Sequence, residues 1–295
     1  MRFLLVVVLL AALVGRFLPL LFRPLEGSAI RMFEQGLIPD WLSRFGMRYL
    51  LQQRLDQQAV DCGPEGSETE RTCISTFIDD LKSRQIAEQT SSANEQHYEV
   101  PTEFYNLVLG QRHKYSCALY PEDTLRSQAL QRLDSAEIAM LRLYAERAQI
   151  ASSARLRVLD LGCGWGSVTL WFAENFPNCQ FVGFSNSRTQ REYILGQAKA
   201  RGLTNIDVIT GDINLVSSLP DGIAGFDRVI SIEMFEHMKN YQKLLRKVSG
   251  FMNPGGLLFV HIFIHKRIPF HFIDSGDPSD WMARHFFTGL YLTFI

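Results

Sequence analysis

Short apolar runs alternate with helix-forming stretches from Leu156 onward, and this alternation constrains the fold more than any other feature of the sequence. The apolar runs are RVLDLG, FVGFS, IDVITGD, FDRVISIE and GLLFVHIF, and the stretches between them include residues 168–175, 190–201 and 241–251. Such alternation is typical of parallel strands joined by crossover helices. The sequence therefore predicts a doubly wound, mostly parallel α/β sheet with five strands.

A glycine-rich turn follows the first apolar run. The segment VLDLGCGWGS places Gly162, Gly164 and Gly166 between a buried strand and a helix, and Asp160 stands two residues before the first glycine. Glycine has no Cβ, so the backbone can bend sharply there and approach a ligand closely. The spacing differs from the GxGxxG fingerprint of dinucleotide-binding folds. We predict a small-molecule site at this turn; a purely structural turn is the alternative.

Composition limits the class of partner. The 295 residues are 46% hydrophobic, enough for one sizeable core, and 30 basic residues nearly balance 31 acidic ones. Nothing global points to nucleic acid, so a small molecule is the expected partner. The five cysteines lack the paired spacing of a structural zinc site, and no metal is expected. We interpret all five as reduced thiols in a non-oxidising compartment: Cys62, Cys73, Cys117, Cys163 and Cys179.

Residues 1–23 are expected to be a membrane anchor or a targeting segment. One positive charge precedes an apolar run to Val14, and reading through Arg16 and Pro19 to Phe22 extends this run to about the 20 residues that span a bilayer. The alternatives are a cleaved signal or organelle transit peptide and a buried core helix. The sequence thus predicts a membrane-associated or organelle-targeted protein.

Residues 24–93 are expected to form a helical region with a linker. A basic amphipathic helix is predicted from Pro39 to about Gln58, packed on the main domain or lying on an anionic membrane surface. The Gly, Pro and acid cluster at residues 61–71 reads as the linker, and a short helix is predicted near residues 74–88. Apolar residues at near-helical spacing predict a longer helix within residues 123–150.

Four sequence blocks together resemble one family: NEQHYEVPTEFY, KYSCALY, VLDLGCGWGS through SNSRTQREYI, and ISIEMFEHMKNY. Over about residues 94–289 they are similar to the coclaurine N-methyltransferases, within the wider group that includes the cyclopropane-fatty-acyl-phospholipid synthases. The resemblance implies a class I methyltransferase with a Rossmann-like sheet and S-adenosyl-L-methionine as cofactor. It also implies a helical cofactor lid over residues 94–150 and a cofactor-binding domain over residues 151–289.

The resemblance further implies which residues hold the cofactor. The glycines of the turn would cradle its amino acid end. No Asp or Glu ends the second strand, where most class I enzymes bind the ribose, so neutral groups would take that role. Asp212, after the third strand, would lie near the adenine; a turn or cap aspartate is its alternative. Three further residues lie in the expected lid: Tyr98, Tyr115 and Ser116. The remaining cofactor residues implied lie after the second and third strands: Ser185, Asn186, Gln190 and Ile213.

Glu233, Glu236 and His237 follow the fourth strand, at the edge where open α/β sheets bind ligands. Cyclopropane synthases typically have Gly in place of Glu233, whereas coclaurine-type enzymes have Glu, so the resemblance implies a small amine as acceptor. An ammonium ion has no lone pair and must lose a proton before it can be methylated. We therefore expect His237 to act as base, with Glu236 orienting it or sharing the proton, and Glu233 to attract the amine. A buried structural network is the alternative.

Two other hypotheses remain. Cys117, Glu236 and His261 match the residues that hold a bicarbonate base in cyclopropane synthases, so a lipid acceptor is the first alternative, and a membrane segment fits it. Both branches continue beyond the FFTG of residues 286–289, so residues 290–295 are expected to be a divergent, truncated tail and the final strands to be missing. A non-catalytic cofactor-binding protein is the second alternative.

Overall fold

The computed structural model describes residues 27–88, 102–216, 225–277, 280–287 and 290–294. Its centre is a five-stranded sheet in the order β3-β2-β1-β4-β5, and every neighbouring pair of strands is parallel. The strands are β1 Arg157–Leu161, β2 Gln180–Ser185, β3 Ile206–Thr210, β4 Phe226–Ile232 and β5 Met252–His261. The predicted doubly wound α/β fold and its five strands are confirmed.

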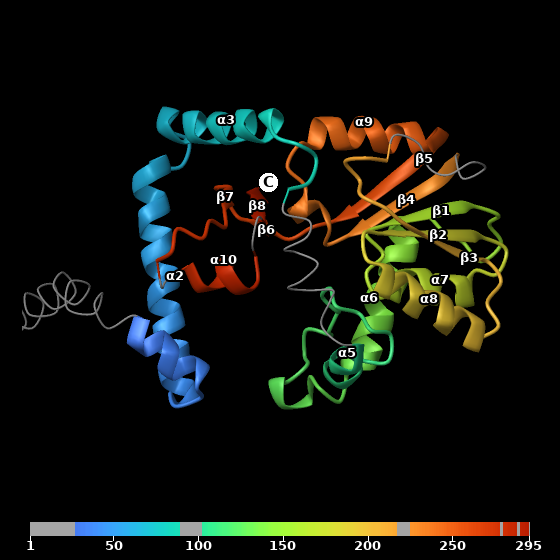
Figure 1. Ribbon diagram of the computed structural model, residues 1–295, viewed down its shortest axis with the longest axis horizontal. Helices are drawn as coiled ribbons and strands as arrows, with labels where there is room; N and C mark the ends of the chain where they lie inside the picture. Colours follow the sequence, from blue (N-terminus) through green and yellow to red (C-terminus); the bar gives the residue numbers. More distant parts are fainter. Residues whose placement is uncertain (1–26, 89–101, 217–224, 278–279, 288–289, 295) are drawn as a thin grey trace, which may run out of the picture.

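Helices cover both faces of the sheet (Figure 1). Helices α6 Leu133–Arg147, α7 Ser167–Asn175 and α8 Arg188–Ala200 lie on one face, and α9 Tyr241–Phe251 lies on the other. Successive strand residues point to opposite faces, so Val158 packs with α6 and α7 while Leu159 packs with α9. Because both faces are buried, the strands read as continuous apolar runs in the sequence.

The helix predicted within residues 123–150 is shorter than expected. Helix α6 begins only at Leu133, and the residues before it form a loop that contains the 3₁₀ turn η1 Arg126–Gln128. Leu130, which helped the periodic pattern, is largely exposed and does not contact the core. A separate short helix, α5 Thr102–Val108, precedes this loop.

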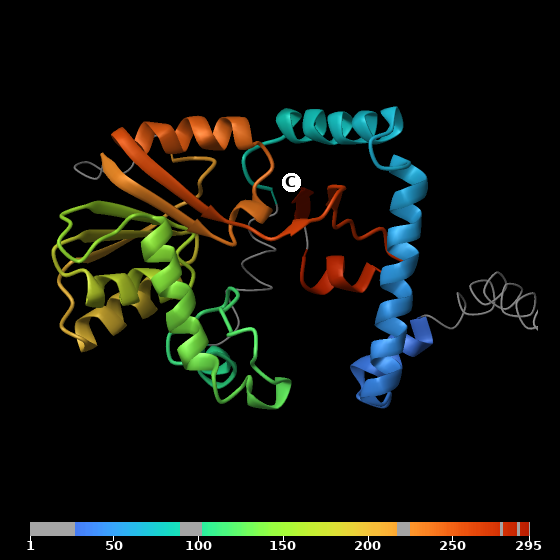
Figure 2. The same cartoon turned by 180° about the vertical axis from the view of Figure 1, so that it is seen from behind.

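The N-terminal region forms a helical arm that extends away from the sheet (Figure 2). Helix α2 Asp40–Cys62 confirms the predicted helix and continues four residues further, and α3 is Glu68–Ser83. The predicted linker is therefore reduced to residues 63–67. The Ser67 side chain accepts a hydrogen bond from the Glu70 backbone N–H, and this N-cap begins α3 earlier than the sequence pattern suggested.

The expectation of five reduced cysteines was wrong for two of them. Cys62, the last residue of α2, and Cys73, in α3, form a disulfide with a Cα–Cα distance of 5.4 Å. The two residues are 11 apart in sequence, and only the tight turn between the helices brings them together. The other three, Cys117, Cys163 and Cys179, are free thiols.

A small second sheet lies between the arm and the main sheet (Figure 1). Its strands are β6 Ile264–His265, β8 Tyr291–Phe294 and β7 Phe270–His271, in the order β6-β8-β7, and α10 Trp281–His285 lies beside it. The central strand, β8, thus falls within the segment expected to be a divergent tail. Arg267 joins this region to the arm through hydrogen bonds of 2.7 and 3.0 Å to Glu70.

The segment expected to anchor the chain in a membrane, residues 1–23, lies outside the described residues. Among the helices that the structure does describe, none combines the length and the apolar character needed to cross a bilayer.

Candidate functional site

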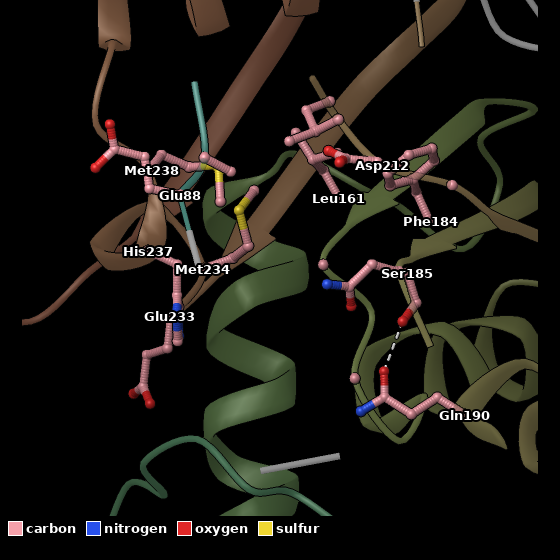
Figure 3. Close-up of a pocket in the computed structure, with 16 residues that line it drawn as sticks. Glu88, Leu161, Phe184, Ser185, Gln190, Asp212, Glu233, Met234, His237 and Met238 are labelled. Carbon is pink, nitrogen blue, oxygen red and sulfur yellow. Dashed lines mark hydrogen bonds between the residues drawn. The ribbon is translucent and has the colours of Figure 1, made fainter. Parts of the chain in front are cut away.

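One pocket opens at the carboxyl ends of the parallel strands. Figure 3 shows its two sides, with Ser185 and Gln190 on one and Glu233 and His237 on the other. The pocket joins the glycine-rich turn to the acid and imidazole groups after β4, two regions 70 residues apart in the sequence. We call the side formed by Gly162, Gly164, Ser185 and Gln190 the glycine wall.

The glycine-rich turn has the backbone that its sequence predicted. Gly162 and Gly164 line the pocket with φ angles of 90° and 53°, in the left-handed region that favours glycine. The backbone N–H groups of Gly162 and Cys163 donate to the Phe184 carbonyl at 2.9 and 3.1 Å, which fixes the turn against the end of β2. A Cβ on Gly164 would meet no protein atom within 4 Å, so the backbone there is open for a ligand.

Asp160 and Gly166 belong to the same motif but do not line the pocket. Asp160 is buried and its Oδ2 accepts a hydrogen bond of 2.6 Å from the Thr169 hydroxyl, which ties β1 to α7. Burial raises the pKa of this carboxyl to about 6. At Gly166 a Cβ would lie 2.6 Å from the Ile194 side chain, so glycine permits close packing of α7 on α8. Both residues shape the turn from behind.

The end of β2 offers an amide donor to the pocket. The Ser185 hydroxyl donates to Gln190 Oε1 at 2.6 Å, and the Ser187 backbone N–H donates to Ser185 at 3.0 Å. Gln190 Nε2 is buried and has no partner among the described residues. A ribose hydroxyl could accept this hydrogen bond, so the neutral group fits the cofactor without an acidic residue. Asn186 also lines the pocket.

Asp212 and Ile213 line the pocket after β3, as expected, and Asp212 also stabilises a turn. Its Oδ1 accepts a hydrogen bond of 2.8 Å from the Asn214 backbone N–H. The turn role that the sequence left as an alternative is therefore real and coexists with exposure to the pocket.

A short strap that no sequence pattern predicted lines one side of the pocket. Ala87 and Glu88, expected to lie in a helix, follow α3 in an extended segment and line the pocket. The Asn214 side chain holds the Ala87 backbone by two hydrogen bonds, of 3.0 and 2.9 Å, and the Lys239 N–H donates to the Ile86 carbonyl at 2.7 Å. No local signal marks these residues, because their partners are more than 120 residues away.

Glu233 stands in an unusual backbone turn. Its φ is 48°, and its backbone N–H donates to the His261 carbonyl at 2.8 Å. Non-glycine residues held in this region cluster at functional sites. The strain directs the Glu233 side chain toward the lid segment, while His237 and Met234 line the pocket beside it.

Glu233, Cys117 and His261 form what we call the Cys–Glu–His cluster. The Cys117 backbone N–H donates to Glu233 Oε1 at 3.0 Å, and Cys117 Sγ lies 3.8 Å from His261 Nε2. On the far side of the imidazole, His261 Nδ1 shares a hydrogen bond of 2.8 Å with the Tyr144 hydroxyl. The resemblance had placed Glu236 with Cys117 and His261; the structure places Glu233 there, because the turn after β4 points the two carboxylates in different directions.

Glu236 lies behind the pocket. It is 1% exposed, and its Oε1 accepts a hydrogen bond of 2.8 Å from the Phe263 backbone N–H. Burial raises the pKa of this carboxyl to about 7, and Oε2 has no partner among the described residues. Its hydrogen bond runs to Phe263, so the orientation of His237 by Glu236 stays a prediction.

Lys114 is a buried cation that sequence analysis quoted only as part of a block. Its ammonium donates to the hydroxyls of Ser116 and Tyr144, at 2.5 and 3.1 Å, and lies 4.8 Å from the centre of the Tyr144 ring. Burial lowers its pKa to about 8, although Glu233 opposes this effect. Its chemistry was visible in the sequence, but nothing local showed that it lies under the site.

The expected lid is described only in part. Tyr98 lies outside the described residues. Tyr115 is half-exposed, with its ring 5.5 Å from that of Tyr105, and Ser116 holds Lys114. Neither residue is among those that line the pocket.

Comparison with known proteins agrees with this geometry. The (S)-coclaurine N-methyltransferase of Papaver somniferum is 38% identical over 264 residues, which cover 90% of this chain and 70% of that protein. The crystal structure of coclaurine N-methyltransferase bound to N-methylheliamine and SAH gives a TM-score of 0.79 at 35% identity, and covers 90% of this chain and 72% of that one. The cyclopropane-fatty-acyl-phospholipid synthase of Escherichia coli strain K12 is 27% identical over 65% of this chain and 44% of its own length.

The parallel sheet, the glycine-rich turn and these similarities define a class I methyltransferase that uses S-adenosylmethionine. Residues 85–295 match the family described as mycolic acid cyclopropane synthetase. The chain belongs to this family, and within it is similar to the coclaurine N-methyltransferases.

Proposed function

We propose that this protein methylates the nitrogen of a small amine, with Glu233 binding the protonated amine and His237 receiving its proton. The observation that carries the proposal is the position of Glu233, which lines the pocket and also belongs to the Cys–Glu–His cluster. A carboxylate at that point attracts a cation and repels an anion.

The cofactor and the acceptor need different surfaces. S-adenosylmethionine, when bound, supplies an electrophilic methyl group on a sulfonium centre. The glycine wall suits it, because Gly162 and Gly164 allow close approach and Gln190 Nε2 offers an unused donor. The chain's own task is then to hold the acceptor nitrogen facing this wall. Such positioning contributes up to about 7 to 11 kcal/mol in well-oriented systems.

Proton removal falls to the ionisable groups after β4. An amine bound as ammonium would form an ion pair with Glu233. His237 lines the same pocket, and a neutral imidazole there accepts the proton that frees the nitrogen lone pair. A positioned base of this kind contributes about 10²- to 10⁴-fold. Glu236, buried behind the pocket, supports the turn that carries both residues.

The lipid alternative fits less well. It needs an anionic base held by Cys117 and His261, yet the Glu233 carboxylate is already hydrogen-bonded to the Cys117 backbone. A second anion beside it would be repelled. Two relatives that are 38% and 36% identical over 90% and 88% of this chain are N-methyltransferases by name. Both arguments favour the amine.

The test incubates the full chain with methyl-labelled S-adenosylmethionine and, separately, with coclaurine or with vesicles of unsaturated phospholipid. We expect label in the extracted amine and none in the lipid. Label in lipid alone would overturn the proposal. Calorimetry with S-adenosylhomocysteine on the same preparation provides the control, because a chain that binds it and yet methylates neither acceptor is the non-catalytic cofactor-binding alternative.

We also propose that α2 lies on an anionic membrane surface. Trp41, Phe45 and Leu51 are 63–70% exposed on this helix, with Arg44 and Arg48 among them. Aromatic and basic side chains mixed in this way are typical of interfacial helices. Flotation with phosphatidylserine vesicles tests it: wild type should float, and the double variant Trp41→Ser, Phe45→Ser should not. Leu215→Ser, at an exposed leucine elsewhere, is the matched control.

A further inference from the structure

The Cys–Glu–His cluster brings together three groups that ligate metal ions. A thiol, a carboxylate and an imidazole each offer one ligand atom, and these atoms all lie within 4.8 Å of one another. They come from three distant segments: the lid segment, the turn after β4 and the last residue of β5. The three ligands are far apart in the sequence and follow no metal-binding spacing, so the sequence did not predict a metal.

The spacing of the three atoms is close to that of a metal site. In a tetrahedral zinc site with Zn–S near 2.3 Å and Zn–N near 2.0 Å, the sulfur and nitrogen lie about 3.6 Å apart. Cys117 Sγ and His261 Nε2 are 3.8 Å apart. The widest separation exceeds the tetrahedral value by only about 1 Å, within the reach of side-chain adjustment.

The surroundings orient these groups as a metal site requires. His261 Nδ1 is engaged by the Tyr144 hydroxyl, so Nε2 faces the cluster. Ligating histidines usually have their second nitrogen held in this way. The Cys117 backbone N–H fixes the Glu233 carboxylate through Oε1, and one carboxylate oxygen of Glu233 lies within 4.8 Å of the other two ligand atoms. Cys117 is exposed, so an ion can enter and a fourth position stays open to solvent.

The charges of the cluster also suit a divalent cation. A thiolate and a carboxylate together carry two negative charges, and the imidazole is a neutral ligand. Lys114 and Arg147 are cations that act on His261, and the Lys114 ammonium is held by the hydroxyls of Ser116 and Tyr144. A mixed sulfur, nitrogen and oxygen ligand set selects zinc or cobalt over magnesium or calcium.

We propose that Cys117, Glu233 and His261 form a binding site for a thiophilic divalent cation such as Zn²⁺, placed where it competes with the acceptor. When the ion binds, the Cys117 thiol releases its proton to solvent, and sulfur–metal, oxygen–metal and nitrogen–metal bonds form. Glu233 then no longer attracts an ammonium ion. The second part rests on the proposed function: the ion should inhibit competitively against the amine and not against S-adenosylmethionine.

The first experiment titrates the full chain with Co²⁺ in the absence of air and of thiol reductants, which keeps the Cys62–Cys73 disulfide intact. A sulfur-to-cobalt charge-transfer band should saturate at one equivalent. Cys117→Ser should abolish the band, and Glu233→Gln and His261→Gln should each weaken binding at least about 10-fold. Tyr144→Phe, which removes the hydrogen bond that orients His261 and one of the two that hold the Lys114 ammonium, should weaken it about 10- to 100-fold. Cys179→Ser, at a buried thiol beside the Ala154 carbonyl, is the matched control and should retain the band.

A second measurement needs no variant. Co²⁺ should protect Cys117 of the wild-type chain from alkylation by iodoacetamide, read by mass spectrometry of the peptides. No cobalt band, a band that persists in Cys117→Ser, or unprotected Cys117 would each overturn the site. These readouts do not depend on turnover, so a chain that binds cobalt but leaves coclaurine unmethylated would refute the proposed function and keep the metal site.

Discussion

The two sides of the pocket are built in different ways. The glycine wall comes from two short segments, the turn after β1 and the end of β2 with the start of α8, and it presents backbone groups and neutral side chains. The opposite side carries Glu233 and His237 and adjoins Cys117 and His261, which come from three separate segments and all ionise. A cofactor that does not vary can be held by a fixed local turn. An acceptor that must be recognised and deprotonated needs charges brought together from a distance.

Among the tests of these separate roles, the largest effect is expected on amine turnover in a Glu233 variant. Glu233→Gln keeps the acceptor for the Cys117 N–H but removes the negative charge. We expect kcat/KM for the amine to fall about 10²- to 10⁴-fold while the Kd for S-adenosylhomocysteine changes less than about twofold. Steady-state kinetics and calorimetry measure the two. Glu146→Gln, on the exposed end of α6, is the control. If amine turnover and S-adenosylhomocysteine binding fell equally, the two sides of the pocket would not have separate roles.

Glu236 tests whether ionisable groups on the side of the pocket after β4 lower the free energy of unfolding. Burial raises the pKa of Glu236 from its ordinary value of 4.5 to about 7. Its folded-state pKa is therefore above the unfolded one, so its favourable contribution is complete below about pH 4.5 and is lost as pH rises through about 7. Glu236→Gln should match wild type near pH 4.5 and exceed it above pH 7 by on the order of 3 kcal/mol.

Urea unfolding at several pH values measures this difference. A variant that is less stable than wild type above pH 7 would show instead that the Glu236 carboxylate is stabilised in the folded state.

The glycine wall is tested by two matched glycines. Gly164 and Gly202 both have positive φ, 53° and 67°, and a Cβ at either would meet no protein atom within 4 Å. Each Ala variant should lose about 1 kcal/mol of stability from backbone strain. Only Gly164→Ala places its methyl group in the pocket, so it alone should weaken S-adenosylhomocysteine binding, by at least about 10-fold. Equal binding in the two variants would remove Gly164 from the cofactor site.

The smallest effect is expected at the strap. Asn214→Ala removes both hydrogen bonds that hold the Ala87 backbone beside the pocket. Each is worth about 1 kcal/mol, and part of that loss should appear as roughly threefold weaker cofactor binding. Asn175→Ala removes one local hydrogen bond in α7 and is the control. Calorimetry that finds the two variants alike would show that the strap is not part of the site.

The sequence predicted the sheet and the glycine-rich turn because both depend on local patterns. Five apolar runs gave five strands, and the segment from Val158 to Ser167 formed the expected bend. The sequence pattern predicted secondary structure less reliably for segments whose packing partners are far away in the sequence. Leu130 has the helical spacing of a core residue, so the predicted helix was too long, but its side chain is exposed. The strap residues were likewise predicted to continue a helix, and they are not helical.

The sequence by itself determined the fold, through five apolar runs, and the ionisable residues after β4, while four blocks that resemble a known family implied the cofactor class. Each of these features depends on short local patterns. Tertiary structure decided that Glu233 rather than Glu236 meets Cys117 and His261, that Lys114 lies beneath them, and that Cys62 bonds to Cys73. These contacts depend on how a strained turn and distant segments pack together. Packing is a property of the whole chain, so no local pattern contains it.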